Sequence, residues 1–377
     1  MVLCCLTKFN YFNKLFSMEI VSEVIENIVV LNEQLEFAKG EKETPSANFF
    51  VVCEDLETEN MPKNIYEYDI CGMSVIDWVK RACINPPAVL KLNSDDNILD
   101  IVKPYASKAE YSVVLYASTP LVRKQHIRDL LGYVSRKGLG VCKLKKGYVF
   151  KNDYIMGVDE IFSVDTYDFA SDDFYEVKDF DDLTYAESVL KNKVLYFHKK
   201  NGAIFNSEAT ISIDAGTEIG YATIVGGNVS FLENSAVGTS SEILNGVILK
   251  KSKVGDDAVI GVNSTIIGSV IKSGAKIGEG CLIKNSVIGE NTIIEAGSTI
   301  VTSGIKENVQ IAESVNLNNA RVFENVKIGR LSKIYGEDVP VVISSGATIG
   351  SNVEIASYNI YKEAVIESNK KLIQGDK

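Results

Sequence analysis

The chain has few of the residues that build metal and redox sites. It contains only two histidines, His126 and His198, among 377 residues, which excludes a metal site made mainly of imidazole. Its seven cysteines are odd in number, irregularly spaced and never arranged as Cys-x-x-Cys. Neither a disulfide framework nor a zinc site is therefore expected, and the thiols fit the reducing cytosol. We expect a cytoplasmic protein.

Long apolar runs and an excess of basic charge are also lacking. No apolar run approaches the roughly 18 residues that a membrane span needs, so no membrane association is expected. The net charge of −11 would repel nucleic acid and anionic lipid, so neither is an expected partner. The chain starts without the basic residues that open a signal peptide. We interpret residues 1–17 as an over-called start, with translation beginning at Met18.

The first half of the chain alternates helix-like and strand-like segments. Residues 75–82 and 123–135 carry apolar side chains at helical spacing, and residues 111–117 form a short apolar run. This alternation predicts an α/β domain, in which helices cover both faces of a mostly parallel sheet. We place this domain at residues 18–180.

One long helix is expected between the two halves. Its apolar face consists of Leu183, Ala186, Leu190, Val194 and Phe197. Asp181 or Asp182 is expected to cap its start and Gly202 its end. We interpret residues 181–202 as a helical arm that joins the halves.

The second half carries an aliphatic repeat with a period of about six residues. Ile243, Ile260, Ile277 and Ile294 are each 17 residues apart, and Gly, Asp, Asn and Ser fill the gaps. This period is typical of a chain wound into a triangular prism, with one aliphatic side chain per face pointing inward. The pattern weakens across 305–340 and then returns. We assign 203–360 to a parallel β-helix and 361–377 to a C-terminal tail, and we expect the flat faces to pack into a homotrimer.

Three stretches resemble one known family. They are "MPKNIYEYDICGMSVIDWV" at 61–79, "VVLYASTPLV" at 113–122, and the segment 177–220 with Leu183, Ala186, Glu187, His198, Asn201 and Gly202 in the family's order. They resemble the bifunctional UDP-N-acetylglucosamine pyrophosphorylase/glucosamine-1-phosphate acetyltransferase family. The resemblance implies a Rossmann-like nucleotidyltransferase domain, a long helical arm and a left-handed parallel β-helix of hexapeptide repeats. In that family Mg²⁺ assists the transfer of a nucleotide to a sugar phosphate.

The chain departs from this family at the nucleotide site that the resemblance implies. Pro62 and Lys63 match the family's Pro-Lys pair, but the loop before them has no glycine or arginine. It carries four carboxylates instead: Glu54, Asp55, Glu57 and Glu59. These carboxylates would repel a triphosphate unless a cation intervened. The family's second glycine loop, expected near 88–100, and most of its sugar-binding segment are also missing.

Two further positions of the implied site are changed. Ser118 stands where the family has an aspartate for Mg²⁺, and Lys178 stands where it has a ligating asparagine. An ammonium group cannot ligate Mg²⁺, which prefers hard oxygen ligands. We take Lys63, Ser118 and Lys178 as candidate phosphate- or substrate-binding residues, because two lysines could hold a phosphate without a metal. The alternative is that both lysines are ordinary surface residues. No catalytic residue and no cofactor is assigned, and Mg²⁺ is expected only in an active enzyme.

The acetyltransferase site that the resemblance implies is also depleted. No histidine follows His198, and the short stretch 356–361 offers only Tyr358 and Asn359. General base catalysis would need another tuned side chain. We expect His126 to be an exposed surface residue, and His198 to pack at the end of the arm or to interact with its C-terminal dipole.

Three functions follow from these observations. The first is a binding or scaffold protein, a pseudoenzyme that keeps the architecture of a sugar-1-phosphate nucleotidyltransferase and binds a nucleotide or sugar phosphate. The second is a divergent active pyrophosphorylase that makes a UDP-sugar for envelope synthesis. The third is a hexapeptide acyltransferase with a site between subunits, which would bind acyl-CoA. Release of pyrophosphate in the presence of Mg²⁺ separates the first two.

Overall fold

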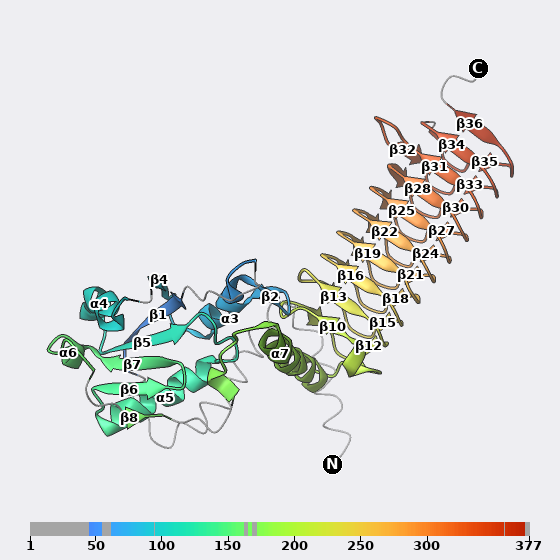
Figure 1. Ribbon diagram of the computed structural model, residues 1–377. Coiled ribbons are helices and arrows are strands. Elements are labelled where there is room, and N and C mark those ends of the chain that lie inside the picture. The colour runs from blue at the N-terminus through green and yellow to red at the C-terminus, as the bar shows by residue number, and fades with distance from the viewer. Residues whose placement is uncertain are drawn as a thin grey trace, which may run out of the picture.

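The computed structural model describes residues 45–54, 62–93, 95–161, 165–167, 172–357 and 359–373. The expectations for residues 1–17, for Tyr358, and for three carboxylates of the acidic loop, Asp55, Glu57 and Glu59, lie outside the described residues. Figure 1 shows an α/β domain, a long helix and a stack of β-coils, in that order along the chain.

Six strands form the sheet of the α/β domain. In spatial order they are β4 (Ala88–Leu92), β1 (Ala47–Glu54), β5 (Tyr111–Tyr116), β7 (Gly147–Lys151), β6 (Val141–Leu144) and β8 (Asp165–Thr166). Strand β1 is parallel to both β4 and β5, whereas β7 is antiparallel to β5 and β6. The sequence ANFFVVCE of β1 is almost continuously apolar because both faces of this central strand are covered.

Helices cover both faces of this sheet. Helices α3 (Val75–Ala82) and α5 (Lys124–Lys137) pack on one face, against Phe49 and Val51 of β1. The 3-10 helix η2 (Lys103–Lys108) and helices α4 (Ile98–Val102) and α6 (Asn152–Ile155) lie on the other face, against Phe50 and Val52. Shorter elements are η1 (Ile65–Glu67) and η3 (Asp172–Phe174). The predicted α/β domain with two covered faces is confirmed.

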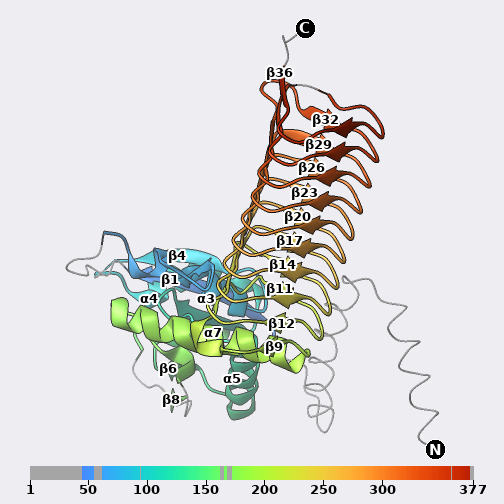
Figure 2. The same ribbon diagram turned by 90° about the vertical axis from the view of Figure 1, so that its right-hand side faces the viewer.

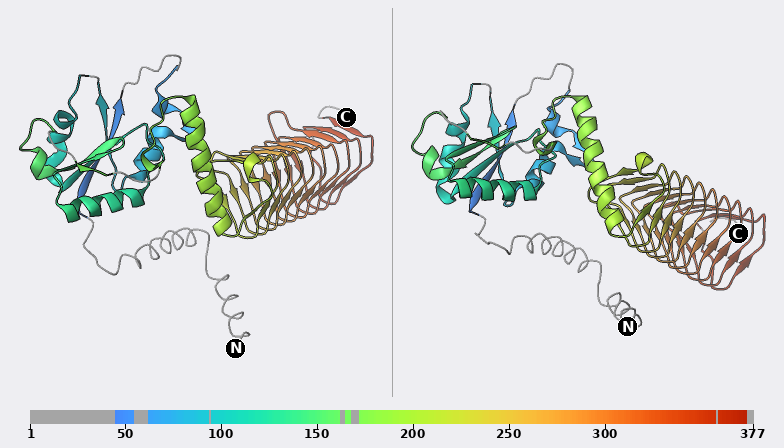
Figure 3. Two further views of the ribbon diagram at one scale, coloured as in Figure 1. Left: turned by 60° about the horizontal axis from the view of Figure 1, so that its bottom comes forward. Right: turned by 90° about the horizontal axis from the view of Figure 1, so that it is seen from below.

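The arm is helix α7 (Phe180–Lys200), which runs from the α/β domain to the first coils (Figure 3). Its N-cap is Asp179, whose carboxylate accepts a hydrogen bond from the Asp182 backbone N–H at 2.9 Å. The expected cap at Asp181 or Asp182 was therefore wrong: both lie in the first turn of the helix, two and three residues after the observed N-cap. Phe197 was also wrongly placed on the buried face, since 47% of it is exposed. The helix packs its start on the α/β domain and its end on the β-helix, so Leu195 and His198 are buried instead.

The coils form three parallel sheets along one axis, as Figure 2 shows from the side. The first face runs from β10 (Ser212–Ile213) to β36 (Lys371–Ile373) and has ten strands. The second face runs from β11 (Glu218–Ile219) to β32 (Val341–Ile343) and has eight. The third face runs from β9 (Ile204–Phe205) to β35 (Val365–Ile366) and has ten. This is the left-handed parallel β-helix that the resemblance implied.

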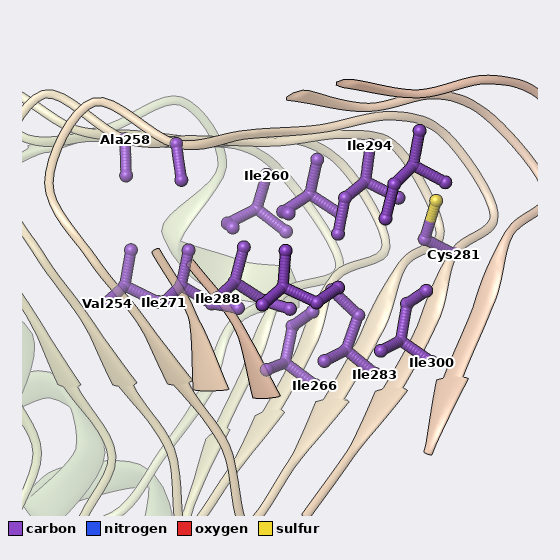
Figure 4. Close-up of a cluster of buried hydrophobic side chains, with 14 of the residues drawn as sticks. Val254, Ala258, Ile260, Ile266, Ile271, Cys281, Ile283, Ile288, Ile294 and Ile300 are labelled. Carbon is purple, nitrogen blue, oxygen red and sulfur yellow. The ribbon is translucent and has the colours of Figure 1, made fainter. Parts of the chain in front are cut away.

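Stacked aliphatic side chains fill the prism (Figure 4). Ile266, Ile283 and Ile300 pair from strand to strand in one face, and Val254, Ile271 and Ile288 do so in the next. All six are at most 4% exposed. The coils also continue without a break through 305–340, and the last one contains β35 and β36. The β-helix therefore reaches Ile373, beyond the expected end at residue 360.

A ladder of serine hydroxyls runs along one corner of the β-helix. Its central members are Ser252, Ser269, Ser286 and Ser303, which are buried. Each hydroxyl donates to the carbonyl two residues earlier, at 2.7–2.8 Å. It also accepts from the backbone N–H 17 residues later, at 3.0–3.2 Å. The serine hydroxyls thus form hydrogen bonds with backbone N–H and carbonyl groups at the corner, where the chain leaves the sheets.

A small hairpin holds the two halves together beside the arm. Strands β2 (Asp69–Ile70) and β3 (Met73–Ser74) are joined by Cys71 and Gly72. The Cys71 carbonyl accepts a hydrogen bond from the Ala215 N–H of the first coil at 2.9 Å. Gly72 has φ +75°, and a Cβ there would lie 2.4 Å from the Asp214 side chain. Only glycine fits this contact between the domains.

Candidate functional site

The candidate site lies at the carboxyl ends of the parallel strands, the edge where α/β sheets bind ligands. Glu54 is the last residue of β1, and Tyr116 is the last residue of β5. Lys146 comes from the tight turn between β6 and β7. Glu176 and Lys178 come from the segment that leads into the arm. Four separate parts of the chain therefore meet at this edge.

An alternating chain of charges connects these residues. The Lys146 ammonium lies 2.7 Å from a carboxylate oxygen of Glu54 and 2.8 Å from one of Glu176. The other oxygen of Glu176 lies 3.1 Å from the Lys178 ammonium. Lys146 also lies 4.5 Å from the centroid of the Tyr116 ring. The side chains of Lys146, Glu54 and Glu176 are only 18–24% exposed, whereas that of Lys178 is 65% exposed.

The surroundings keep Lys146 and Glu176 charged. Burial by itself would lower the pKa of Lys146, but its two carboxylate partners outweigh burial and raise it. Burial would likewise raise the pKa of Glu176, but Lys146 and Lys178 lower it. Burial, and then the charge of Glu54, raise the pKa of Tyr116 to about 12. The four charges cancel, so this cluster offers no excess positive charge to a polyphosphate.

This arrangement does not fit Mg²⁺. The ammonium of Lys146 occupies the space between the two carboxylates, where a divalent cation would otherwise bind. Across the described ranges, no group of three or more His, Cys, Asp or Glu side chains could hold a metal ion. The described cysteines, Cys53, Cys71, Cys83, Cys142 and Cys281, are all buried free thiols. Burial raises the pKa of Cys71 and of Cys83 to about 12, which makes both poor nucleophiles.

The structure gives partners to both lysines predicted from the sequence. Lys63 donates to the backbone carbonyl of Glu67 at 2.7 Å and lies 4.4 Å from the centroid of the Tyr68 ring. Lys178 forms the ion pair with Glu176. The third predicted residue, Ser118, is buried, and within the described part of the chain its hydroxyl has no hydrogen-bond partner. The contacts of Lys63, Ser118 and Lys178 are therefore known, but these contacts do not show one ligand bound by all three residues.

Ser118 and Lys178 lie on adjacent segments, because the Ser118 carbonyl accepts from the Val177 N–H at 2.8 Å. Lys63 is linked to the same region through Tyr68, whose ring packs edge-on against Phe180 with centroids 5.4 Å apart. Lys146 and Glu176 were missed in the sequence. Their only signal was a pair of lysines at a hairpin turn, Lys145 and Lys146, and no spacing could have linked them to Glu54.

Neither histidine belongs to this site. His126 was expected on the surface but is only 7% exposed, because η3 folds over the start of α5. Its Nε2 lies 2.9 Å from Asp173 and 2.7 Å from the Arg123 guanidinium. Burial, and then Arg123, lower its pKa to about 4. His198 is buried between the arm and the first coil, and burial lowers its pKa to about 4.

Helices of the described ranges are all too short or too polar to cross a bilayer.

No protein-family model matches this chain. The chain is similar to the bifunctional protein GlmU of Streptococcus suis, with 31% identity over 107 residues, which cover 26% of this chain and 23% of that protein. The same protein of Streptococcus agalactiae is 28% identical over 106 residues, again covering 26% and 23%. The alignment thus spans about a quarter of the length of these relatives.

Solved structures also align with part of the chain. UDP-N-acetylglucosamine acyltransferase of Francisella novicida aligns with 44% of this chain and 59% of its own, with 16% identity and a TM-score of 0.31. The enzyme of the same name from Campylobacter jejuni aligns with 42% of this chain and 70% of its own, with 16% identity and a TM-score of 0.24.

Proposed function

We propose that the α/β domain is a sugar-1-phosphate nucleotidyltransferase-like module that binds its ligand, or acts as a scaffold, without metal-dependent nucleotidyl transfer. The observation that carries this proposal is the position of Lys146 between Glu54 and Glu176. Phosphoryl and nucleotidyl transfer depend on positioning and on neutralising the charge of the phosphates, usually with a divalent cation. A fixed ammonium between the acids removes the place for that cation. The similarity to GlmU supports the choice of family.

The ligand class that we propose is a nucleotide or a sugar phosphate. Lys63 and Lys178 are both exposed, and each would have to exchange its present partner for a phosphate oxygen. Lys178 is bound to one carboxylate and is 65% exposed, whereas Lys146 is held by two carboxylates, so Lys178 is the lysine of the charged cluster that a phosphate can recruit more easily. A homotrimer is part of the proposal. It is supported by aliphatic side chains that are exposed on the first flat face of the β-helix, such as Ile248 and Leu282.

Thermal shifts of the full chain test this proposal. The protein is heated with nucleoside triphosphates, UDP-sugars, sugar-1-phosphates or acetyl-CoA, each with and without Mg²⁺. A ligand at 100 times its dissociation constant stabilises a protein by about 2.7 kcal/mol. We expect any shift from a nucleotide or sugar phosphate to be independent of Mg²⁺, and to weaken when Lys178 is replaced by Gln. The matched control is Lys143→Gln, an exposed lysine on strand β6.

A shift that requires Mg²⁺, together with release of pyrophosphate, would overturn the proposal in favour of an active pyrophosphorylase. A shift with acetyl-CoA alone would favour a hexapeptide acyltransferase. Light scattering gives the molar mass, and a monomer at micromolar concentration would rule out the homotrimer.

A further inference from the structure

A hollow of about 490 Å³ lies on the second face of the β-helix, well away from the α/β domain. The outward positions of that face pair from strand to strand in the order Val270, Val287, Gly304, Arg321 and Val342. Gly304, in β26 (Gly304–Ile305), interrupts this column of side chains. A Cβ at Gly304 would meet no other atom within 4 Å. The backbone at Gly304 therefore forms the floor of the hollow, because no side chain fills the space above it.

An extended corner forms a wall beside this floor. Gly304 and Arg321 are paired 17 residues apart, whereas Arg321 and Val342 are paired 21 apart, so this coil holds 21 − 17 = 4 extra residues. They fall in the corner 336–340, between β31 (Lys333–Tyr335) and β32. The Asn319 side-chain amide holds this corner by donating to the Glu337 carbonyl at 3.0 Å. Pro340 lines the hollow.

The hollow concentrates positive charge on an acidic protein. Lys272, Lys306 and Arg321 line it, together with one carboxylate, Glu307. In the described part of the chain, none of these three cations lies within ion-pair distance of a carboxylate. Two more acids, Glu337 and Asp338, stand in the extended corner itself. Glu324, which lies just after strand β29 (Ala320–Val322), accepts a hydrogen bond from the Ser345 hydroxyl at 2.7 Å. Among the side chains that line the hollow itself, three cations face one acid, and this local excess of positive charge attracts an anion.

Apolar side chains complete the lining. Val287 is 44% exposed and Phe323 is 37% exposed, and both border the hollow with Pro340. Small-molecule sites typically combine such apolar walls with a few convergent polar groups. The guanidinium of Arg321 matches the geometry of a phosphate and can bind it through two parallel hydrogen bonds.

We propose that this hollow binds a small organic phosphate, with the phosphate near Arg321 and Lys306 and a compact apolar group over Gly304. This site lies on the β-helix and goes beyond the function proposed for the α/β domain. Gly304 supplies the room, the extended corner supplies the wall, and the unpaired cations supply the charge complementarity.

Isothermal titration calorimetry of the full chain with phenyl phosphate tests this site. We expect phenyl phosphate to bind more tightly than inorganic phosphate or benzoate, and phenol to show no binding. Gly304→Val restores the valine column and fills the hollow, and Arg321→Gln removes the guanidinium. Arg321→Gln should weaken binding of phenyl phosphate at least about tenfold, the loss expected when one charge-assisted contact is removed. Gly304→Val should weaken it by at least about the same factor, because the valine side chain fills the space that the apolar group needs. The matched control is Lys276→Gln, an exposed lysine on the third face in β21 (Lys276–Ile277), which should change binding less than about twofold.

The proposal fails if phenyl phosphate does not bind, or if Gly304→Val and Arg321→Gln bind it as the unchanged protein does. It also fails if Gly304→Val alters the molar mass in solution, because the hollow would then belong to an interface between copies. Circular dichroism checks that each variant is folded. If Gly304→Val does not fold, the binding measured with Arg321→Gln tests the proposal by itself. Lys178→Gln should leave this binding unchanged, which separates this site from the one proposed in the α/β domain.

Discussion

Lys146 and Glu176 form an ion pair of 2.8 Å although 30 positions of the chain separate them. The lysine comes from a tight hairpin turn, and the glutamate precedes the arm. A second acid, Glu54, approaches the same ammonium from the end of β1 at 2.7 Å. Because the three side chains are largely buried, removing the lysine would leave two carboxylates facing each other with little water between them.

We therefore expect Lys146→Met to destabilise the protein by about 3 kcal/mol, the lower end of the cost of orphaning a buried charge. The vacated space between Glu54 and Glu176 should then accept a divalent cation. Millimolar Mg²⁺ or Ca²⁺ should restore part of the lost free energy of unfolding, measured by urea denaturation. The exposed lysine variant Lys143→Met should show neither effect. Equal stability of Lys146→Met with and without the cation would contradict this expectation.

Stability should fall as the pH is lowered from about 6.5 to about 4. Both histidines have folded-state pKa values near 4, below their ordinary value of 6.5. The unfolded chain therefore binds more protons in this window, so acid favours unfolding. At pH 5 each histidine should cost on the order of 2 kcal/mol relative to pH 7.5. His198→Phe keeps an apolar ring in place but cannot be protonated. Between pH 7.5 and pH 5, its free energy of unfolding, measured by urea denaturation, should therefore fall by less than that of the unchanged protein. An identical pH dependence would show that His198 does not titrate in this way.

Gly72→Ala should weaken the contact between the hairpin and the first coil. The residue has φ +75°, and its new Cβ would overlap the Asp214 side chain. Gly138→Ala is the matched control, because Gly138 has φ +64° but nothing within 4 Å of a Cβ. Backbone strain alone should cost about 1 kcal/mol at Gly138, and the clash should make Gly72→Ala cost more. Scanning calorimetry should also show the two halves unfolding less cooperatively in Gly72→Ala. Equal losses in both variants would argue against a packed junction.

Ser269→Ala should destabilise the β-helix. Its hydroxyl donates to the Ile267 carbonyl at 2.7 Å and accepts from the Ser286 N–H at 3.0 Å. Alanine leaves a buried N–H without this acceptor, which costs about 1–3 kcal/mol. The exposed corner variant Ser273→Ala should cost much less. The free energy of unfolding in guanidinium measures both, and a loss below 0.5 kcal/mol for Ser269→Ala, within the range of ordinary surface changes, would disprove the role of the ladder.

The β-helix could be predicted closely because each coil is a local unit. One inward aliphatic and one small corner residue specify each side of the prism, so a period of 17 residues is visible without knowing any distant contact. The coils beyond residue 360 were missed because Val365 and Leu372 stand among polar residues at the exposed end of the stack. Helix α3 was predicted residue for residue for the same local reason, its amphipathic spacing.

The candidate site could not be predicted in this way. Lys63, Ser118 and Lys178 were chosen because they stand at positions of the site that the resemblance implies. Their actual contacts, such as the ion pair of Lys178 with Glu176, come from other segments and are not encoded in the neighbouring sequence. The cluster around Lys146 depends on where a hairpin turn lies relative to the end of β1. His126 was misplaced for a related reason, since η3 covers its helix from a segment about 50 residues away.

The sequence by itself determined the order of an α/β domain, an arm and a β-helix, because apolar periodicity and turn residues act over a few neighbouring residues. It also showed which ligands for Mg²⁺ are absent from the positions that the resemblance implies. Only the tertiary structure decided that Lys146 lies between two buried carboxylates, and that Gly304 lies beneath an extended corner among three cations. Both arrangements bring together side chains from separate segments, and such long-range contacts are set by packing between elements rather than by their local pattern.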